Sequence, residues 1–393
     1  MNFWMLLGEA RSKCEHLAGI PLRPDVAAKL YQIYLSKGIH ATTSIEGNTL
    51  TEDEVRKRVE GRLPLPKSRE YLGREVDNIA GACNEIVRTI FANPASPLTA
   101  TEICRFNRQV LQGLSVDDGV VPGEFRTFSV GVGNYRGAPA EDCPYLLDRM
   151  CEWLNGEDFR SDDAEKTFVF AFLKAVLIHL YIAWIHPFGD GNGRTARLVE
   201  FQLLVQSGLL PLPAAHLLSN HYNKTRTRYY QELDRASRSG GDILPFLIYA
   251  AEGFVDGLRE QLAFVKQQHL DITWENYVHD HFRGLDGAVD RRRKHLVLDM
   301  PDKVWVPRNE VTQISPRVAQ EFARKSEKTV SRDLEALVES GLLQRKDGSY
   351  QAARETILAF LPPTCPPPAS LGNDRGKAKV VRTSTKRAKT EKS

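Results

Sequence analysis

The stretch IHPFGDGNGRTARL, residues 185–198, places a histidine, an aspartate, three glycines and two arginines directly after a long apolar run. Pro187 disfavours a helical conformation at the residue before it, so we expect a helix to end near Ile185 and a loop to follow. Glycines let backbone N–H groups approach a ligand closely. The segment TARLVEFQLLVQ (195–206) then continues as a helix, and a glycine-rich loop that leads into a helix is a typical anion site.

The side chains of this loop suit a phosphate ligand. Arg194 and Arg197 are three residues apart, so they share one helix face, and guanidinium groups match phosphate oxygens. Asp190 is the kind of carboxylate that holds Mg²⁺ beside phosphates, and His186 can accept a proton from an incoming hydroxyl. The pattern predicts transfer of a phosphate-linked group. A structural histidine beside surface arginines is the alternative that the residues alone leave open.

Composition places the chain among ordinary soluble globular proteins, with 393 residues, 42% hydrophobic and 26% charged. Six scattered cysteines without a CxxC pair argue against a zinc site or a redox dithiol and favour reduced, cytoplasmic thiols. The run 167–185 approaches membrane length, but Lys174 and His179 interrupt it. We therefore expect a buried core helix and no membrane partner.

The hydrophobic periodicity predicts a mainly α protein with one small β-hairpin. A short helix is expected at about 41–47, and the next helix begins with Thr51 as N-cap and Glu54 completing a capping box. The alternation in FSVGV and the following Gly-Asn predict a hairpin within 122–137. The other expected helices are two within 1–40, and one each at 68–92, 99–113, 142–155, 163–185, about 192–207, 222–237 and 242–270.

The C-terminal part has a different character. A composition shift near 283–294 precedes an amphipathic helix that begins at 329 and two short strands around a Lys-Asp-Gly turn, which predict a winged-helix domain at 293–360. Residues 361–393 are Pro-rich and then basic, and we expect them to be disordered. The segment 374–393 carries eight Lys/Arg and two Asp/Glu, so this tail is a candidate for non-specific nucleic-acid binding.

The charges on the winged helix favour protein contact over DNA contact. Its recognition-like helix carries Lys328 and Arg332 against Asp333, Glu335 and Glu339. Such an acidic bias is unfavourable beside a phosphate backbone.

The loop 186–197 resembles the signature of the Fic family, HxFx(D/E)GNGRxxR, without departure. The matching residues are His186, Phe188, Asp190, Gly191, Asn192, Gly193, Arg194 and Arg197. The resemblance extends to 125–155 and 229–242. It implies an N-terminal helical region (1–110), a Fic catalytic core (111–282) with a hairpin flap, and the winged helix (293–360); the tail has no counterpart.

The resemblance implies a protein adenylyltransferase, which transfers AMP from ATP to a Ser, Thr or Tyr hydroxyl of a protein target or of the chain itself. His186 would be the general base and Asp190 the Mg²⁺ ligand. Asn192 and the amides of Gly191 and Gly193 would cradle phosphates, while Arg194 and Arg197 would grip the β- and γ-phosphates.

Three further expectations come from the resemblance. Relatives that phosphorylate carry Lys where this chain has Gly193, so Gly193 favours AMP transfer. The hairpin flap would pair with the target as an added strand. Tyr229 and Tyr230 would line the adenine pocket, with core packing as the alternative for both.

The stretch TTSIEGN (42–48) resembles the family's inhibitory motif, (S/T)xxxE(G/N), at Thr42, Glu46 and Gly47. A carboxylate at Glu46 would pair with Arg197 and keep it from the γ-phosphate, and Glu46 would orient water if the chain also removes AMP. A solvated glutamate at a helix end is the alternative. A nucleotide-sensing DNA-binding regulator is the competing function, and a homodimer stays open.

Overall fold

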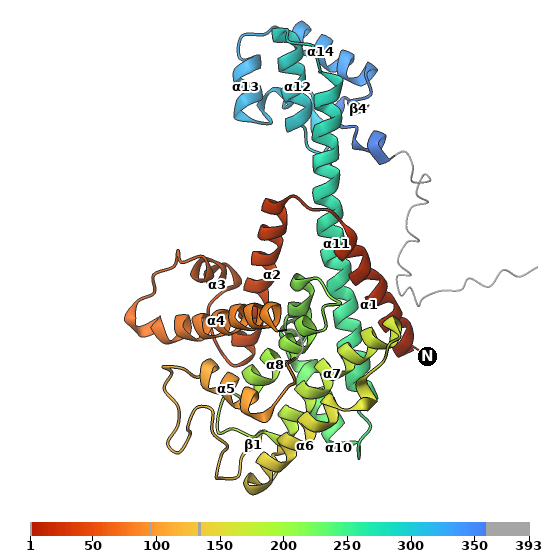
Figure 1. The fold of residues 1–393 in the computed structure, drawn as a ribbon. Helices are drawn as coiled ribbons and strands as arrows, with labels where there is room; N and C mark the ends of the chain where they lie inside the picture. Colours follow the sequence, from red (N-terminus) through yellow and green to blue (C-terminus); the bar gives the residue numbers. More distant parts are fainter. Residues whose placement is uncertain (1, 94–95, 133–134, 359–393) are drawn as a thin grey trace, which may run out of the picture. The chain divides into compact units, whose positions relative to one another are not determined.

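The computed structural model describes residues 2–93, 96–132 and 135–358, and these residues form mostly helices (Figure 1). The chain divides into two compact units, residues 1–266 and 267–393. The predicted mainly α fold class is confirmed. The tail at 361–393 and the hairpin turn at 133–134 lie outside the described residues.

The first unit consists of helices and one short hairpin. Its helices are α1 (Asn2–Gly19), α2 (Pro24–Ile45), α3 (Glu52–Val59), α4 (Glu70–Ala92), α5 (Ala100–Val110), α6 (Cys143–Asn155), α7 (Ala164–Ile185), α8 (Asn192–Gln206), α9 (Leu217–Lys224), α10 (Arg226–Arg238) and the beginning of α11 (Leu244–His281), and its strands are β1 (Gly131–Val132) and β2 (Tyr135–Arg136). Residues 2–110, predicted as a separate region, share one hydrophobic core with 111–266.

Helices α7 and α8 lie side by side in this core and carry the signature loop between them (Figure 1). Among the described helices, α7 alone is long and apolar enough to cross a membrane by length and composition, and 56% of its apolar window is buried inside the protein. Phe172, Val176 and Leu180 belong to the buried core. This packing agrees with the expected core helix.

Three predicted element boundaries are corrected. The segment 41–47 belongs to the end of the 22-residue α2 and is not a separate helix, because Gly38 keeps a helical conformation and the first glycine with positive φ is Gly47, at +98°. The predicted helix at 222–237 is interrupted at Thr225. Helix α11 continues to His281 instead of ending at 270. The capping box of Thr51 and Glu54 is confirmed.

The second unit contains the small winged-helix domain that the sequence predicts. Its described elements after α11 are α12 (Ala288–Asp299), β3 (Val306–Pro307), α13 (Pro316–Phe322), α14 (Glu327–Glu339), β4 (Leu343–Lys346) and β5 (Ser349–Ala352), with the strands in the antiparallel order β3-β5-β4. Asp347 and Gly348 both have positive φ, 49° and 75°, as a two-residue hairpin turn requires.

Candidate active site

The signature loop begins where α7 ends. His186 caps α7 in the left-handed conformation, with φ of 51° and ψ of 57°. A non-glycine residue rarely adopts this conformation, and residues held in it cluster at functional sites. Gly191 is also left-handed, with φ of 76°, and α8 starts at the next residue. Two left-handed residues therefore turn the chain from α7 into α8.

The side chain of Asn192 closes this loop. Its Oδ1 accepts a hydrogen bond from the Phe188 amide (2.9 Å), and its Nδ2 donates to the Phe188 carbonyl (2.8 Å). Phe188 is buried and its ring stacks on Phe125. Both polar atoms of the Asn192 side chain therefore bond within the loop, and its backbone N–H is the group left for the predicted phosphate contact.

One of the two glycine amides expected at the phosphates is also engaged. The N–H of Gly191 donates to Asp190 Oδ1 at 2.5 Å. The N–H groups of Asn192 and Gly193 lie in the first turn of α8, where they have no partner within the helix. This turn is where the sequence predicts an anion site.

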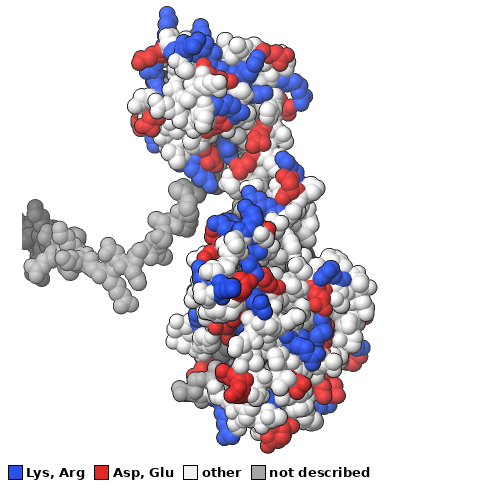
Figure 2. All heavy atoms as spheres, turned by 90° about the vertical axis from the view of Figure 1, so that its left-hand side faces the viewer, with Lys and Arg blue, Asp and Glu red and all other residues white. Residues whose placement is uncertain are grey.

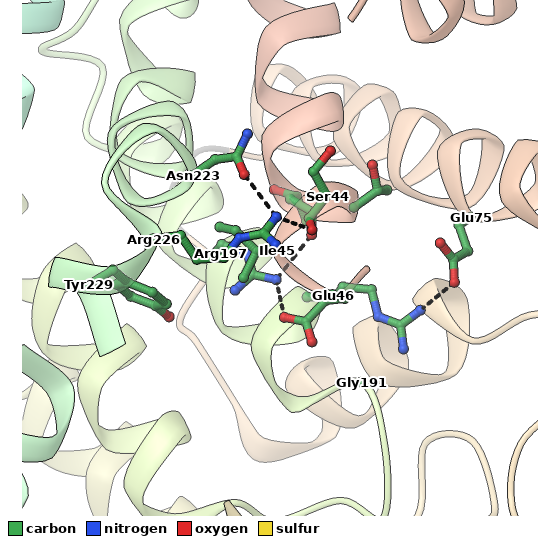
Figure 3. Close-up of polar contacts among 12 residues, drawn as sticks. Ser44, Ile45, Glu46, Glu75, Gly191, Arg197, Asn223, Arg226 and Tyr229 are labelled. Atoms are coloured by element: carbon green, nitrogen blue, oxygen red, sulfur yellow. Dashed lines mark hydrogen bonds and ion pairs between the residues drawn. The ribbon is translucent and has the colours of Figure 1, made fainter. Parts of the chain in front are cut away.

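The carboxylate of Glu46, at the end of α2, lies on this turn. A Cβ atom added to Gly193 would meet Glu46 Oε1 at 2.3 Å, so only glycine permits the approach. The same Oε1 accepts from Nη2 of Arg197 at 2.5 Å (Figure 3). A side-chain carboxylate thus occupies the helix N-terminus that an anionic ligand would use.

Arg197 is 2% exposed and also donates to the carbonyl oxygen of Thr42 (3.1 Å). Thr42 therefore contributes its backbone to this contact. Burial raises the pKa of Glu46, but the charge of Arg197 and its hydrogen bond outweigh this effect and hold the pKa below its ordinary value. The ion pair is present at neutral pH, and the alternative of a solvated glutamate is set aside.

Arg194 is held by carboxylates on two sides. Its Nη2 lies 3.2 Å from Asp190 Oδ1, and its Nη1 lies 3.4 Å from Glu75 Oε1. Glu75 in turn accepts from Asn48 Nδ2 (2.7 Å). The side chain of Asp190 is 48% exposed. Asp190 is therefore accessible to a cation.

Two further residues contact the end of α2, and sequence reasoning did not identify them in this role. Arg226, the first residue of α10, donates to the carbonyl oxygen of Ser44 and to Asn223 Oδ1 (Figure 3). The hydroxyl of Tyr230 lies 3.5 Å from the carbonyl oxygen of Ile45. The last carbonyl groups of a helix lack partners within the helix, so donors from elsewhere satisfy them here.

Arg126 ties the hairpin segment to the signature loop, and sequence reasoning did not identify it. Its Nε donates to the carbonyl of His186 (2.7 Å) and its Nη1 to that of Phe128 (2.7 Å). The side chain is buried. Tyr135 of β2 adds a hydrogen bond from its hydroxyl to the Trp184 carbonyl at 2.6 Å. Buried donors to backbone carbonyls leave no pattern in a single sequence.

A cavity of about 440 Å³ lies between these elements. Its lining includes most of the predicted site residues, namely Glu46, His186, Asn192, Gly193, Arg197, Tyr229 and Tyr230, together with His179, Tyr135 and Trp184. Thr42, Gly47, Asp190, Gly191 and Arg194 are not part of its lining. The volume lies in the range of small-molecule sites.

The side chains of His186 and Tyr229 supply polar groups to the lining of this cavity. Nδ1 of His186 lies 3.4 Å from the Ala183 carbonyl, which favours a proton on Nδ1 and leaves Nε2 as the base. Burial lowers the pKa of His186 below its ordinary value, and the charge of Glu46 partly offsets this effect. Tyr229 is buried, and its hydroxyl pairs with His179 Nε2 at 2.8 Å. Tyr229 therefore both lines the cavity and packs in the core.

Comparison with known families now bears on this site. Residues 97–204 match the family model described as Fic/DOC family. The chain carries a Fic domain. The matched range includes the loop 186–197, so the resemblance of the signature is confirmed.

Curated relatives and solved structures resemble the chain beyond the Fic domain. It is 28% identical over 246 residues to protein adenylyltransferase fic-1 of Caenorhabditis briggsae, covering 62% of this chain and 44% of that protein. The match to protein adenylyltransferase Fic of Drosophila grimshawi is 31% over 218 residues, covering 54% and 40%. The chain thus spans less than half the length of these relatives.

Two solved structures share the fold of this chain. A Fic family protein from Desulfovibrio desulfuricans superposes with a TM-score of 0.53 at 20% identity, over 89% of this chain and 95% of that one. A segment of Fic-1 from Caenorhabditis elegans gives a TM-score of 0.53 at 24% identity, over 68% and 72%.

Proposed function

We propose that the chain is a protein adenylyltransferase, which transfers AMP from ATP to a hydroxyl of a protein target, the chain itself included. The observation that carries the proposal is one cavity whose lining includes a base, His186, together with Gly193 of the first turn of α8 and Arg197. The adenylyltransferase names of the relatives support the same activity.

His186 acts as the general base. Its Nε2 takes the proton of a Ser, Thr or Tyr hydroxyl, and the freed oxygen attacks the α-phosphorus of ATP. An oxygen–phosphorus bond forms, the bond to the β-phosphate oxygen breaks, and pyrophosphate leaves. A lowered pKa suits this role because the imidazole is neutral at pH 7.

The phosphates bind at the first turn of α8. The Asn192 and Gly193 N–H groups donate no intrahelical hydrogen bond and so can donate to phosphate oxygens, while Arg194 and Arg197 supply positive charge. Tyr229 and Tyr230 line the part of the cavity that takes adenine. Gly193 favours this AMP-transferring arrangement, and the β1–β2 hairpin is the flap that receives the target.

Asp190 holds Mg²⁺ when ATP is bound. The described residues contain no cluster of three or more metal-ligating side chains, but Mg²⁺ needs only one or two carboxylates when phosphates supply the rest. A half-exposed single carboxylate beside Arg194 fits that requirement. The ion supplies neutralisation of phosphate charge.

Glu46 restrains the enzyme. Its carboxylate lies on the turn that would receive phosphate, and its ion pair withholds Arg197 from the γ-phosphate. The same carboxylate would orient water if the chain removes AMP. We also assign the chain to the cytoplasm, which its free cysteines at Cys14, Cys83 and Cys151 suit.

Labelling with ATP carrying ³²P at the α-phosphate tests the proposal. The Glu46→Gly variant, incubated with Mg²⁺, should retain label on protein, visible as self-modification. The double variant Glu46→Gly/His186→Ala should retain none. ATP labelled at the γ-phosphate should leave no label, because the γ-phosphate departs with pyrophosphate. Label from γ-ATP, or label that survives loss of His186, would overturn AMP transfer by this mechanism.

A further inference from the structure

The second unit has balanced charge but an uneven distribution. Residues 267–358 contain 15 Lys/Arg and 15 Asp/Glu. Figure 2 shows basic side chains gathered in clusters on the visible face of this unit, with acidic side chains between them. A set of basic residues of this unit, here called the basic end, lies at or next to the end of β3, the first turns of α14 and the tip of the β4–β5 hairpin. It comprises Arg308, Arg324, Lys325, Lys328, Arg332, Arg345 and Lys346.

The basic end is assembled by strand register and by one arginine. Pro307 of β3 pairs with Ser349 of β5, and Ser349 pairs with Lys346 of β4, so the three lie in one row across the sheet. Arg308 follows Pro307, and its Nη2 donates to the Glu327 carbonyl (3.2 Å) and to Ser331 Oγ (2.6 Å). The hairpin tip and the first turns of α14 therefore lie at the same end of the unit.

Among the described residues, no carboxylate forms an ion pair with a cation of the basic end. Within the described part of the chain, the ion pairs of this unit engage other arginines, such as Arg292, Arg317 and Arg354, and none engages a member of the basic end. Within residues 324–332 and 345–348, which hold the other six cations, the acidic residues are Glu327 and Asp347. All seven cations are exposed. A surface of unpaired cations favours an anionic partner.

The apparent acidic bias of α14 is smaller than its sequence indicates. Asp333 is 0% exposed and is neutralised by Arg292 (2.5 Å) and Arg293 (2.9 Å) from α12. It therefore presents no charge to a partner. The exposed face of α14 carries Lys328 and Arg332 in its first half, and Glu335 and Glu339 in its second half.

This polarity matches one mode of DNA contact. Helices α13 and α14 are joined by the four residues 323–326, as in a helix-turn-helix, and the hairpin follows as a wing. In such motifs the N-terminal part of the second helix enters the major groove. We propose that the second unit binds the phosphate backbone of duplex DNA through the basic end. The Glu335–Glu339 half of α14 then lies farther along the helix, beyond the contacted phosphates.

Fluorescence anisotropy on the full chain with a labelled 20-base-pair duplex of arbitrary sequence tests this binding. Lys328→Ala/Arg332→Ala should weaken binding roughly tenfold and reduce the slope of log K against log salt by about 1.8, since each lost phosphate contact removes about 0.9. The matched control, Arg283→Ala/Lys303→Ala, removes the same charge from residues that contact α11, at Asp280 and Gln267, and should change neither quantity. All variants keep residues 359–393, so the tail contributes equally.

Two further anisotropy measurements, one with a glutamate variant and one with duplex RNA, test the proposal more strictly. Glu335→Ala/Glu339→Ala should leave the affinity equal or higher, because no phosphate contact is removed. A duplex RNA of equal length should bind more weakly, because its major groove is too narrow for α14. Equal losses in the test and control variants, no binding at 50 mM salt, or equal affinity for duplex RNA would overturn the proposal. Unchanged thermal unfolding of each variant excludes misfolding as the cause.

Discussion

Glu46 touches the two groups that an ATP phosphate would need, the first turn of α8 and the Arg197 guanidinium. Glu46→Gly should therefore raise the initial rate of AMP transfer. A pair buried on one side contributes a few kcal/mol, so the increase should reach one to several factors of ten. Initial rates of self-labelling measure it. Glu46→Gln keeps the shape of the side chain without its charge, so its transfer rate should lie between those of the unchanged protein and Glu46→Gly. Equal rates in these three proteins would contradict the proposed restraint.

His186 should limit the rate at low pH. A general base works only when neutral, so the rate is full above its pKa and is lost as the pH falls through that value. Because burial lowers the pKa of His186, the acid limb of kcat/KM in Glu46→Gly should lie below pH 6.5. Glu46 raises this pKa, so Glu46→Gln should show its limb at lower pH than any residual activity of the unchanged protein. An acid limb above pH 6.5 would point to another base.

Substitution of Asn192 should affect stability, whereas substitution of Asp190 should affect activity. Asn192→Asp removes the N–H that satisfies the buried Phe188 carbonyl, so it should lower the free energy of unfolding by about 1–3 kcal/mol. Asp190→Ala removes a half-exposed pair, which contributes at most about 1 kcal/mol, yet it should abolish Mg²⁺-dependent transfer. Urea unfolding and labelling measure the two effects. Full stability in Asn192→Asp would contradict the loop-closing role.

At the scale of helices, α2 is held at its last turn by groups from α8 and α10. Arg226→Ala removes the donor to the Ser44 carbonyl and should raise the transfer rate, by less than Glu46→Gly does. Arg228→Ala is the matched control, because this arginine on the same helix pairs with Glu252 and Glu232 instead of α2. Initial rates of self-labelling compare them. An equal change of rate in both variants would show that Arg226 takes no part in the proposed restraint by Glu46.

Local patterns predicted what local forces determine. The capping box of Thr51 and Glu54 and the turn at Asp347 and Gly348 each depend on residues within three positions, and both are present. The loop at 186–197 was also identifiable, since its residues are close in sequence.

Contacts across long separations were less accessible. Arg226 and Ser44 are 182 positions apart, and a backbone carbonyl as acceptor leaves no trace in the residue types. The Glu46–Arg197 pair, 151 positions apart, was predicted only through a family resemblance. The loop-closing bonds of the Asn192 side chain were not predicted, because a side-chain amide suits a phosphate and a loop backbone equally well. Asp333 was counted as exposed because its neutralising partners come from another helix.

At the scale of the whole chain, two hydrophobic cores share no residue. Calorimetry should therefore show two unfolding transitions. Asp333→Ala leaves the buried Arg292 without a carboxylate and should destabilise the second unit by about 3–5 kcal/mol. The exposed neighbour Glu335→Ala should shift neither transition by more than about 0.5 kcal/mol. One transition that moves as a whole would show that the units unfold together.

The contacts on the last turn of α2 have an evolutionary consequence. Arg197, Arg226 and Tyr230 reach the main-chain oxygens of Thr42, Ser44 and Ile45, which every amino acid supplies. Substitutions at these three positions leave the carbonyl acceptors in place. These hydrogen bonds therefore do not restrict which amino acids occupy the three positions. Glu46 is different, because its side chain makes the contact. A single codon change there removes the carboxylate and leaves the main-chain contacts intact. Descendants of this gene can therefore lose and regain the proposed restraint by point mutation, without rebuilding a helix.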